Sequence, residues 1–266
     1  MADIILKTED VMIKFGGLTA VSGFTTALER GSITSLIGPN GAGKTTAFNI
    51  ITGFYKPTSG RVIFEGEDIT QLEPHLVCKR GIARTFQNIR LFAGGTVLQN
   101  VMTACWVRQK SPWWSAPLQL PLFRREEREI VERSMELLKA VGLEKYASEV
   151  ATGLPYGAQR RLEISRALAT QPRLLLLDEP AAGMNPQESL ELMDFIRSIR
   201  ERFKVTILMI EHDMKVVMGV SEWIRVLDYG ELIAEGTPEQ IRSNPKVIEA
   251  YLGKEAAANR GGGKDA

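Results

Sequence analysis

The sequence predicts an α/β protein whose central sheet is largely parallel. Three observations lead to this class. Short, continuously apolar segments alternate with helical patterns in the last third of the chain. In the first part, one strand-like segment runs directly into a glycine-rich loop. A helix-rich stretch lies between these two regions. Strands that are apolar throughout are typical of parallel sheets that helices cover on both faces.

The N-terminal part has the pattern of short strands joined by tight turns. β-Rich segments occur at residues 4–6, 33–37 and 62–64, and the last of these lies between Gly60 and the turn residues 65–68. Because the segment 33–37 continues into a glycine-rich loop and then a helix-compatible run, it predicts a strand–loop–helix unit.

The middle of the chain predicts helices. Apolar and small side chains recur at helical spacing over residues 130–141, and Gly142 provides a stop. A second helix is expected over residues 156–169. The segment 106–123 contains three tryptophans and three prolines and is expected to be irregular. We expect the helices of approximately residues 90–168 to form a lobe inserted into the α/β core.

The last third returns to alternating strands and helices. Apolar strands are expected at residues 174–177 and 205–210. Between them, Asn185, Pro186 and Glu188 have the order of a helix N-cap, a proline at the first helical position and an acid at the third. The residues expected on the inward face of this helix are Leu192, Phe195, Ile196 and Ile199.

The composition is that of an ordinary globular protein. A chain of 266 residues with 44% hydrophobic and 24% charged residues suits one compact domain with a sub-lobe. We expect this domain over residues 1–254, followed by a disordered tail of alanine, glycine and charged residues at 255–266. The net charge of +1 provides no basic field, so no nucleic-acid partner is expected.

The cysteines and the lengths of the apolar runs indicate the cellular compartment. Two free thiols, Cys78 and Cys105, suit a reducing cytosol, and His75 and His212 cannot complete a common zinc set with them. We expect no signal peptide, and no apolar run approaches the roughly 20 residues that span a bilayer. A role at a membrane would therefore require a partner that holds the protein there.

Residues 38–45 match the phosphate-binding pattern G-x-x-x-x-G-K-[ST] at every fixed position. Glycines let the backbone wrap closely around an anion, and the following helix adds its positive N-terminal end. We expect Lys44 to reach the β- and γ-phosphates of ATP and the Thr45 hydroxyl to hold Mg²⁺. The residues expected to bind the nucleotide here are Gly38, Pro39, Asn40, Gly41, Ala42, Gly43, Lys44, Thr45 and Thr46.

Two adjacent carboxylates, Asp178 and Glu179, end the apolar strand at 174–177. In a parallel sheet they should lie at the same edge as the phosphate loop, because ligands bind beyond the carboxyl ends of the strands. We expect Asp178 to contact Mg²⁺, often through water, and Glu179 to act as the general base for the attacking water. Taken alone, the pair could also be an acidic turn that closes a strand.

Together with further segments, these motifs resemble the ATP-binding cassette (ABC) ATPases. Residues 154–161 stand where that family has its signature loop, 84–87 where it has its Q-loop, 211–213 where it has its switch histidine, and Phe15 where it has an adenine-stacking aromatic. The match runs in order from about residue 4 to 252. The resemblance implies a P-loop NTPase (RecA-like) core, an antiparallel β subdomain at the N-terminal side and an inserted α-helical subdomain.

The resemblance also implies further roles. Phe15 would stack on adenine, although an aromatic after a strand also suits a core position. Gln87 would bind Mg²⁺ and the attacking water, His212 would sense the γ-phosphate, and Gly157 would contact the ATP of a partner subunit. The expected catalytic set is Lys44, Gln87, Glu179 and His212, and the expected metal ligands are Thr45, Gln87 and Asp178.

The sequence departs from the family pattern at two positions. Pro155 replaces the signature serine and offers neither a hydroxyl nor an N–H. That contact must then come from the Gly157 backbone and the positive end of the following helix. Asn185 replaces an acid and keeps the capacity for hydrogen bonds without the charge.

Six segments narrow the resemblance to the larger ATPase subunit of branched-chain amino-acid importers. They are residues 16–21, 84–92, 156–164, 178–186, 211–215 and 236–241. This implies a peripheral motor at the cytoplasmic face of the inner membrane, docked on integral membrane permease subunits that a periplasmic binding protein feeds. Two cassettes would close head to tail around Mg-ATP, as a homodimer or, favoured by the resemblance, a heterodimer with a smaller sister ATPase.

Three alternatives are weaker. A lipid-exporting ABC complex shares nearly the whole motif set. Soluble cassette proteins that act on DNA or ribosomes carry a long coiled-coil insertion or a second cassette, for which 266 residues leave no room. Pro155 motivates the third alternative, a nucleotide-binding module that does not hydrolyse ATP.

Overall fold

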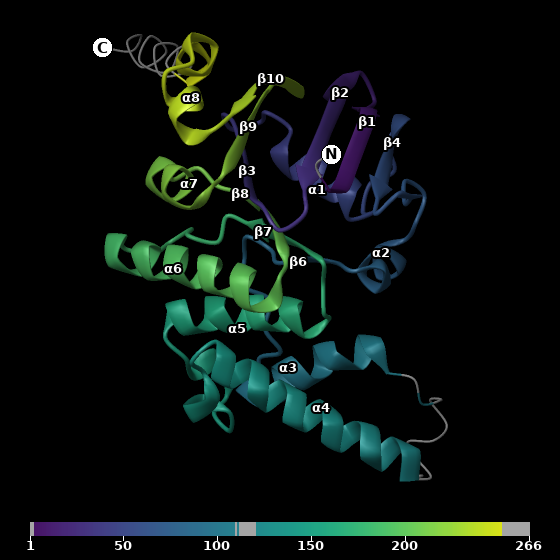
Figure 1. Cartoon of the computed structure of the whole chain (residues 1–266), viewed down its shortest axis with the longest axis vertical. Helices are drawn as coiled ribbons and strands as arrows, with labels where there is room; N and C mark the ends of the chain where they lie inside the picture. Colours follow the sequence, from purple (N-terminus) through teal and green to yellow (C-terminus); the bar gives the residue numbers. More distant parts are fainter. Residues whose placement is uncertain (1–2, 110, 112–120, 252–266) are drawn as a thin grey trace, which may run out of the picture.

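The computed structural model describes residues 3–109, 111 and 121–251, which form two sheets and a helical lobe (Figure 1). Four strands form one sheet in the order β2-β1-β4-β5, and six form the other in the order β10-β9-β3-β8-β7-β6. Figure 1 shows the helical lobe, with α3, α4 and α5, at one end of the molecule and α8 at the other. The expected α/β class with an antiparallel N-terminal sheet and a helical insertion is confirmed.

The four-stranded sheet is antiparallel. Its strands are β1 (Ile4–Phe15), β2 (Leu18–Glu29), β4 (Ser59–Phe64) and β5 (Glu67–Asp68). The expectation of short strands here is wrong for β1 and β2, which each have 12 residues. Exposed polar side chains alternate with buried ones along both strands, and this alternation hides the strands from a search for apolar runs.

The six-stranded sheet forms the centre of the core. Its strands are β3 (Ile33–Ile37), β6 (Ile82–Arg84), β7 (Leu174–Asp178), β8 (Thr206–Ile210), β9 (Trp223–Asp228) and β10 (Glu231–Gly236). Five of them are parallel, and β10 pairs antiparallel with β9 at the edge. Every residue of β3, β7 and β8 is buried, as the continuous apolar runs predict.

The two faces of this sheet pack against different parts of the molecule. On β7, Leu175 and Leu177 pack into a cluster with the helical lobe, whereas Leu174 and Leu176 pack into a cluster with the antiparallel sheet. Successive side chains of a strand point to opposite faces, so an entirely apolar strand serves both clusters. The sheet therefore joins the lobe to the N-terminal strands.

Helices of the core surround the sheet. They are α1 (Lys44–Ile51), α2 (Pro74–Arg80), α6 (Pro186–Phe203), α7 (Met214–Val220) and α8 (Pro238–Arg242). The predicted start of α6 is confirmed: the Asn185 side chain accepts from the N–H groups of Gln187 and Glu188, and the Glu188 side chain accepts from the Asn185 N–H. All four predicted inward residues of α6 are buried.

The lobe contains three α-helices and three short 3₁₀ turns within the described residues. They are α3 (Val97–Cys105), η1 (Trp106–Arg108), α4 (Pro121–Ala140), η3 (Glu144–Tyr146), η4 (Ala151–Gly153) and α5 (Tyr156–Ala169). The bounds predicted for α5 are confirmed, and Gly142 follows α4 with a φ of 73°.

The prediction of an irregular segment at 106–123 is wrong at both of its ends, which are helical. Residues 106–108 form η1, and α4 already begins at Pro121, which the first helical position tolerates. Trp106 stacks on Phe123 with 5.7 Å between the ring centroids, so the two ends of the segment are held together. The other two tryptophans, Trp113 and Trp114, and the predicted tail at 255–266 lie outside the described residues.

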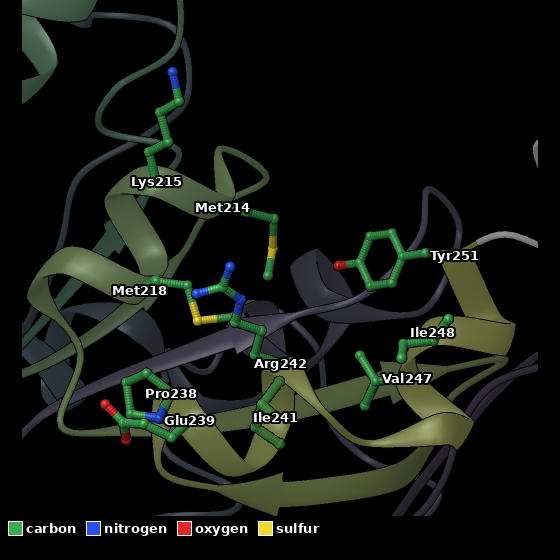
Figure 2. A pocket seen from close by; sticks show the side chains of 10 residues that line it. All are labelled: Met214, Lys215, Met218, Pro238, Glu239, Ile241, Arg242, Val247, Ile248 and Tyr251. Atoms are coloured by element: carbon green, nitrogen blue, oxygen red, sulfur yellow. The ribbon is translucent and has the colours of Figure 1, made fainter.

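A third cluster joins α7 and α8 to β3 and β9 through Ile37, Val217, Val226 and Ile241. Beside it, α7, α8 and residues 247–251 line an apolar pocket of about 740 Å³, across which the side chains of Met214 and Tyr251 face each other (Figure 2). Within the described residues, no helix combines the length and the apolar character that crossing a bilayer requires.

Candidate active site

The glycine-rich loop connects β3 to α1 and lies at the carboxyl edge of the central sheet. Gly43 caps α1 with a φ of 96°, and a Cβ at this position would lie 2.6 Å from the carbonyl oxygen of Ala20. Only glycine fits both constraints. Asn40 and Thr45 are exposed, whereas Gly38, Pro39, Ala42 and Lys44 are buried.

The Lys44 amine is held inside this loop. It donates hydrogen bonds to the carbonyl oxygens of Gly38 and Pro39 at 2.7 and 3.0 Å. Lys44 is also the first residue of α1, so its charge adds to the positive end of the helix. The loop thus presents a fixed cation and backbone N–H groups in one place, which is the environment that a phosphate requires.

The strands β7 and β8 deliver the remaining predicted groups to the same edge. They pair in parallel with Asp178 opposite Ile210, so residues 178–179 and 211–212 leave the sheet side by side. The strand before His212 is therefore the direct neighbour of the acidic strand.

Three predicted residues meet at the Glu179 carboxylate. Gln87 donates from Nε2 to Glu179 Oε2 at 2.6 Å, and His212 Nδ1 lies 3.7 Å from the same oxygen. Glu179 has a φ of 46°, an unusual conformation for a residue other than glycine, and such backbone strain is typical of functional sites. The side chain of His212 is 62% exposed, so the cluster is open to a ligand.

Asp178 forms a buried ion pair that the sequence did not reveal. Arg84 Nη2 donates to Asp178 Oδ2 at 2.6 Å, and the two side chains are 6% and 7% exposed. Arg84 also donates to the Asn49 side chain at 2.7 Å and lies over the rings of Phe48 and Phe86. A hint was present in the sequence, because Arg84 ends a short strand directly before the segment that contains Gln87.

Glu211 is a second residue that the sequence analysis left without a role. It is 1% exposed, and its carboxylate accepts from the N–H groups of Ala181, His212 and Asp213 at 2.7, 3.0 and 3.3 Å. Burial raises the pKa of Glu211, while the three N–H donors oppose this rise. A carboxylate that ends a buried strand beside a candidate histidine is the signal that could have identified it.

The other two predicted residues lie on separate elements. Phe15 ends β1, is 46% exposed, and meets the ring of Tyr55 edge to face at 5.2 Å between centroids. Gly157 lies in the first turn of α5 after the N-cap Pro155, and a Cβ added there would meet nothing within 4 Å. The packing of this chain therefore does not itself explain a glycine at position 157.

The sequence matches two protein families. Residues 21–182 match the family described as ABC transporter, and residues 231–257 match the family described as branched-chain amino acid ATP-binding cassette transporter. The second match covers β10, α8 and the part of the pocket wall in Figure 2 that residues 238–251 form.

Individual relatives match over nearly the whole chain. The high-affinity branched-chain amino acid transport ATP-binding proteins BraF of Pseudomonas aeruginosa and LivG of Escherichia coli are each 47% identical, covering 96% of this chain and 100% of the relative. A probable branched-chain amino acid transport ATP-binding protein LivG of Methanocaldococcus jannaschii is 35% identical and covers 94% of this chain and 98% of the relative.

Solved structures agree with these relatives. The ADP conformation of an ATP-binding cassette of an ABC transporter superposes with a TM-score of 0.82 at 35% identity, covering 94% of this chain and 99% of that one. A dimeric cassette in a post-hydrolysis state, bound to ADP and phosphate, superposes with a TM-score of 0.72 at 27% identity, covering 88% and 99%. The chain therefore belongs to the ATP-binding cassette family of transporter ATPases, which bind ATP and hydrolyse it to power transport.

Proposed function

We propose that Gln87, Glu179 and His212 form the hydrolytic centre of this ATPase, with Glu179 as the general base. The observation that carries the proposal is the convergence of Gln87 Nε2 and His212 Nδ1 on one oxygen of Glu179, beyond the carboxyl ends of β7 and β8. A carboxylate within hydrogen-bond reach of the attacking water accepts its proton as the bond to phosphorus forms. Gln87 positions that water, and His212 contacts the γ-phosphate.

The phosphates of ATP bind along residues 38–46, and Phe15 supplies a platform for adenine. Lys44 provides the charge that stabilises the transferred phosphoryl group, because its amine is already fixed inside the loop. The ring of Phe15 is 46% exposed and packs against Tyr55 in a T-shaped arrangement, so part of an aromatic surface remains accessible to adenine.

The donor set fits Mg²⁺. No group of three or more histidine, cysteine or acidic side chains suited to a metal occurs within the described residues. Mg²⁺ in nucleotide sites takes only one or two protein oxygens and completes its shell with phosphates and water. Thr45, Gln87 and Asp178 offer such oxygens, and because Arg84 already engages Asp178 Oδ2, that carboxylate suits an indirect contact through water. When bound, the cation neutralises developing charge on the β- and γ-phosphates.

Glu179→Gln tests the base assignment. The amide keeps the shape of the side chain but cannot accept the proton, so ATP turnover should fall by about 10² to 10⁴-fold while ATP binding persists and ATP stays trapped in the closed pair. Glu201→Gln, a change of the same chemistry at an exposed position on α6, is the control and should leave turnover unchanged. Normal turnover in Glu179→Gln would reject the assignment.

We further propose that the transporter imports branched-chain amino acids and that this chain is its peripheral ATPase subunit at the cytoplasmic face of the inner membrane. The names of the BraF and LivG relatives and the family match at residues 231–257 support this substrate class. In this proposal the chain pairs head to tail with a smaller sister ATPase, and a periplasmic binding protein delivers the solute to the permease. The dimeric structure of a related cassette bound to ADP and phosphate supports a paired arrangement.

A groove of about 490 Å³ between the sheet and the lobe supports docking on the permease. Its lining includes Phe54 and Phe92, which are 52% and 50% exposed, and Phe86, on whose ring Arg90 lies at 4.4 Å. Half-exposed aromatic side chains beside arginines are typical of binding hot spots. The groove also contains residues adjoining Gln87, so a docked permease helix lies close to the proposed hydrolytic centre.

Uptake of labelled leucine by cells that depend on this chain distinguishes import from lipid export. The importer proposal expects leucine uptake that Glu179→Gln abolishes. Unchanged leucine uptake together with accumulation of an unexported lipid would favour the alternative.

A further inference from the structure

The loop between β7 and α6, residues 179–185, lies next to two other elements of the site. On one side is the end of β8, which carries Glu211 and His212. On the other is the first turn of α5, which presents Gly157. Adjacent residues of the loop, Ala181 and Ala182, each bond to one of these elements.

The first bond ties the loop to the hydrolytic centre. The N–H of Ala181 donates to Glu211 Oε1 at 2.7 Å, while Glu211 Oε2 accepts from the N–H of His212. The carboxylate is 1% exposed, so water does not compete for these bonds. A shift of the His212 backbone therefore moves the Glu211 carboxylate, which in turn pulls on the N–H of Ala181 in the loop.

The second bond ties the loop to the signature helix. The hydroxyl of Tyr156, the first residue of α5, donates to the carbonyl oxygen of Ala182 at 2.9 Å and accepts from Arg160 at 3.3 Å. The ring of Tyr156 lies beside Gly183, where an added Cβ would make ordinary van der Waals contact with the ring and its hydroxyl at 3.5–3.8 Å. Tyr156 is 43% exposed, and this hydroxyl contact rather than burial is what fixes its position.

A third connection runs from α5 back to the hydrolytic centre. Arg160 is 0% exposed and donates to the carbonyl oxygens of Phe86 and Gln87 at 2.9 and 2.8 Å. The side chain of Gln87 in turn donates to Glu179. The start of α5 is therefore bonded to the hydrolytic centre along two routes, one through residues 181–182 and one through the backbone of Gln87.

We propose that Tyr156 is a positioning residue that couples the two ATP sites of the working pair. Its hydroxyl makes the loop at 181–182 and the first turn of α5 move together, so that a change at Glu179 and His212 reaches Gly157, which faces the nucleotide of the opposite subunit. This inference rests on the proposed roles of Glu179, His212 and Gly157. It assigns to one hydroxyl group a part in cooperativity and not in the chemical step.

Tyr156→Phe removes this hydroxyl and keeps the ring. The test uses the purified transporter complex, with ATP turnover measured against ATP concentration. Because a partly exposed hydrogen bond contributes about 1 kcal/mol, the coupling between the two sites should fall by about fivefold. The Hill coefficient should drop towards one, and the half-life of ATP retained by the Glu179→Gln complex should shorten by about the same factor.

Tyr146→Phe is the matched control, since Tyr146 lies on η3 of the same lobe with a similar exposed fraction of 37%. ATP binding to the separated subunit should be the same in both variants, and the melting temperature of Tyr156→Phe should fall by only the few degrees that a hydrogen bond of about 1 kcal/mol contributes. A purely structural role for Tyr156 would lower the melting temperature and leave the Hill coefficient unchanged.

The outcomes separate this inference from the proposed function. If Tyr156→Phe and Tyr146→Phe give the same Hill coefficient and the same retention half-life, the coupling role is rejected while the hydrolytic assignment stands. If the Glu179→Gln complex still hydrolyses ATP at the normal rate, the base assignment is rejected, whatever Tyr156→Phe does to the Hill coefficient.

Discussion

At the scale of single residues, the candidate site was partly readable from the sequence. Short motifs at the ends of elements predicted Lys44, Glu179 and His212 as candidates, because the carboxyl ends of parallel strands share one edge of a sheet. The motifs could not reveal Arg84 as the partner of Asp178, since this pair joins residues separated by 94 positions. Nor could they reveal that Glu211 binds the Ala181 N–H, a contact that exists only after β7 and β8 pair.

The buried Arg84–Asp178 pair gives a prediction at this scale. Arg84→Met should lower the free energy of unfolding by about 3–5 kcal/mol, because removing one partner leaves an uncompensated buried carboxylate. Urea unfolding of the nucleotide-free subunit measures the change. Arg61→Met is a suitable control, since Arg61 pairs with Glu9 at the surface with 64% of its side chain exposed, and it should leave unfolding unchanged within error. If Arg84→Met lowers the free energy of unfolding no more than Arg61→Met does, the buried pair contributes no more to stability than the surface pair.

At the scale of elements, prediction succeeded where the determinants are local. The helix α6 was predicted with its cap, because Asn185, Pro186 and Glu188 act within one turn. The strands β9 and β10 were not predicted, and most of β1 and β2 was missed. Exposed polar side chains occur along β1, β2 and β10, and Arg225 interrupts the apolar residues of β9. Their identity as strands depends on pairing with residues far away in the chain, which no short segment encodes.

The cap of α6 explains why an amide suffices at a position where the family has an acid. The Asn185 oxygen accepts from two N–H groups at 2.9 and 3.0 Å, a task that requires no charge. Asn185→Ala should destabilise the subunit by about 1 kcal/mol, and Asn185→Asp should retain the stability. Thermal unfolding of the unmodified protein, Asn185→Ala and Asn185→Asp measures these differences in stability. A loss in Asn185→Asp as large as that in Asn185→Ala would mean that the amide group makes contacts beyond the cap.

At the scale of the whole molecule, one buried sheet organises everything else. The lobe packs on one face of this sheet and the N-terminal strands on the other. The phosphate loop, Glu179 and His212 all lie at its carboxyl edge. This layout was predictable, because continuously apolar strands require cover on both faces. The groove between sheet and lobe was not predictable, since its lining comes from α2, β6, α3 and α5, and only their packing brings them together.

That groove carries a prediction about assembly. Phe92 is half-exposed, and Arg166 lies 4.6 Å from the centre of its ring, so truncation of Phe92 removes an aromatic contact without opening the core. Phe92→Ala should weaken co-purification with the permease by about tenfold, the effect of losing a hot-spot contact of about 1.4 kcal/mol. ATP binding to the isolated subunit should not change, because Phe92 lies outside the phosphate loop.

Two further variants make the assembly test specific. Phe54→Ala, at the other half-exposed aromatic of the groove, should weaken the complex in the same way. Leu190→Ala removes a side chain that is 53% exposed on α6, outside the groove, and should leave the complex intact. Retention of the permease by both phenylalanine variants at the level of Leu190→Ala would place the docking surface elsewhere. Selective loss in the two phenylalanine variants would instead link permease binding to the surface that borders Gln87. Movements of the permease would then reach the proposed hydrolytic centre directly.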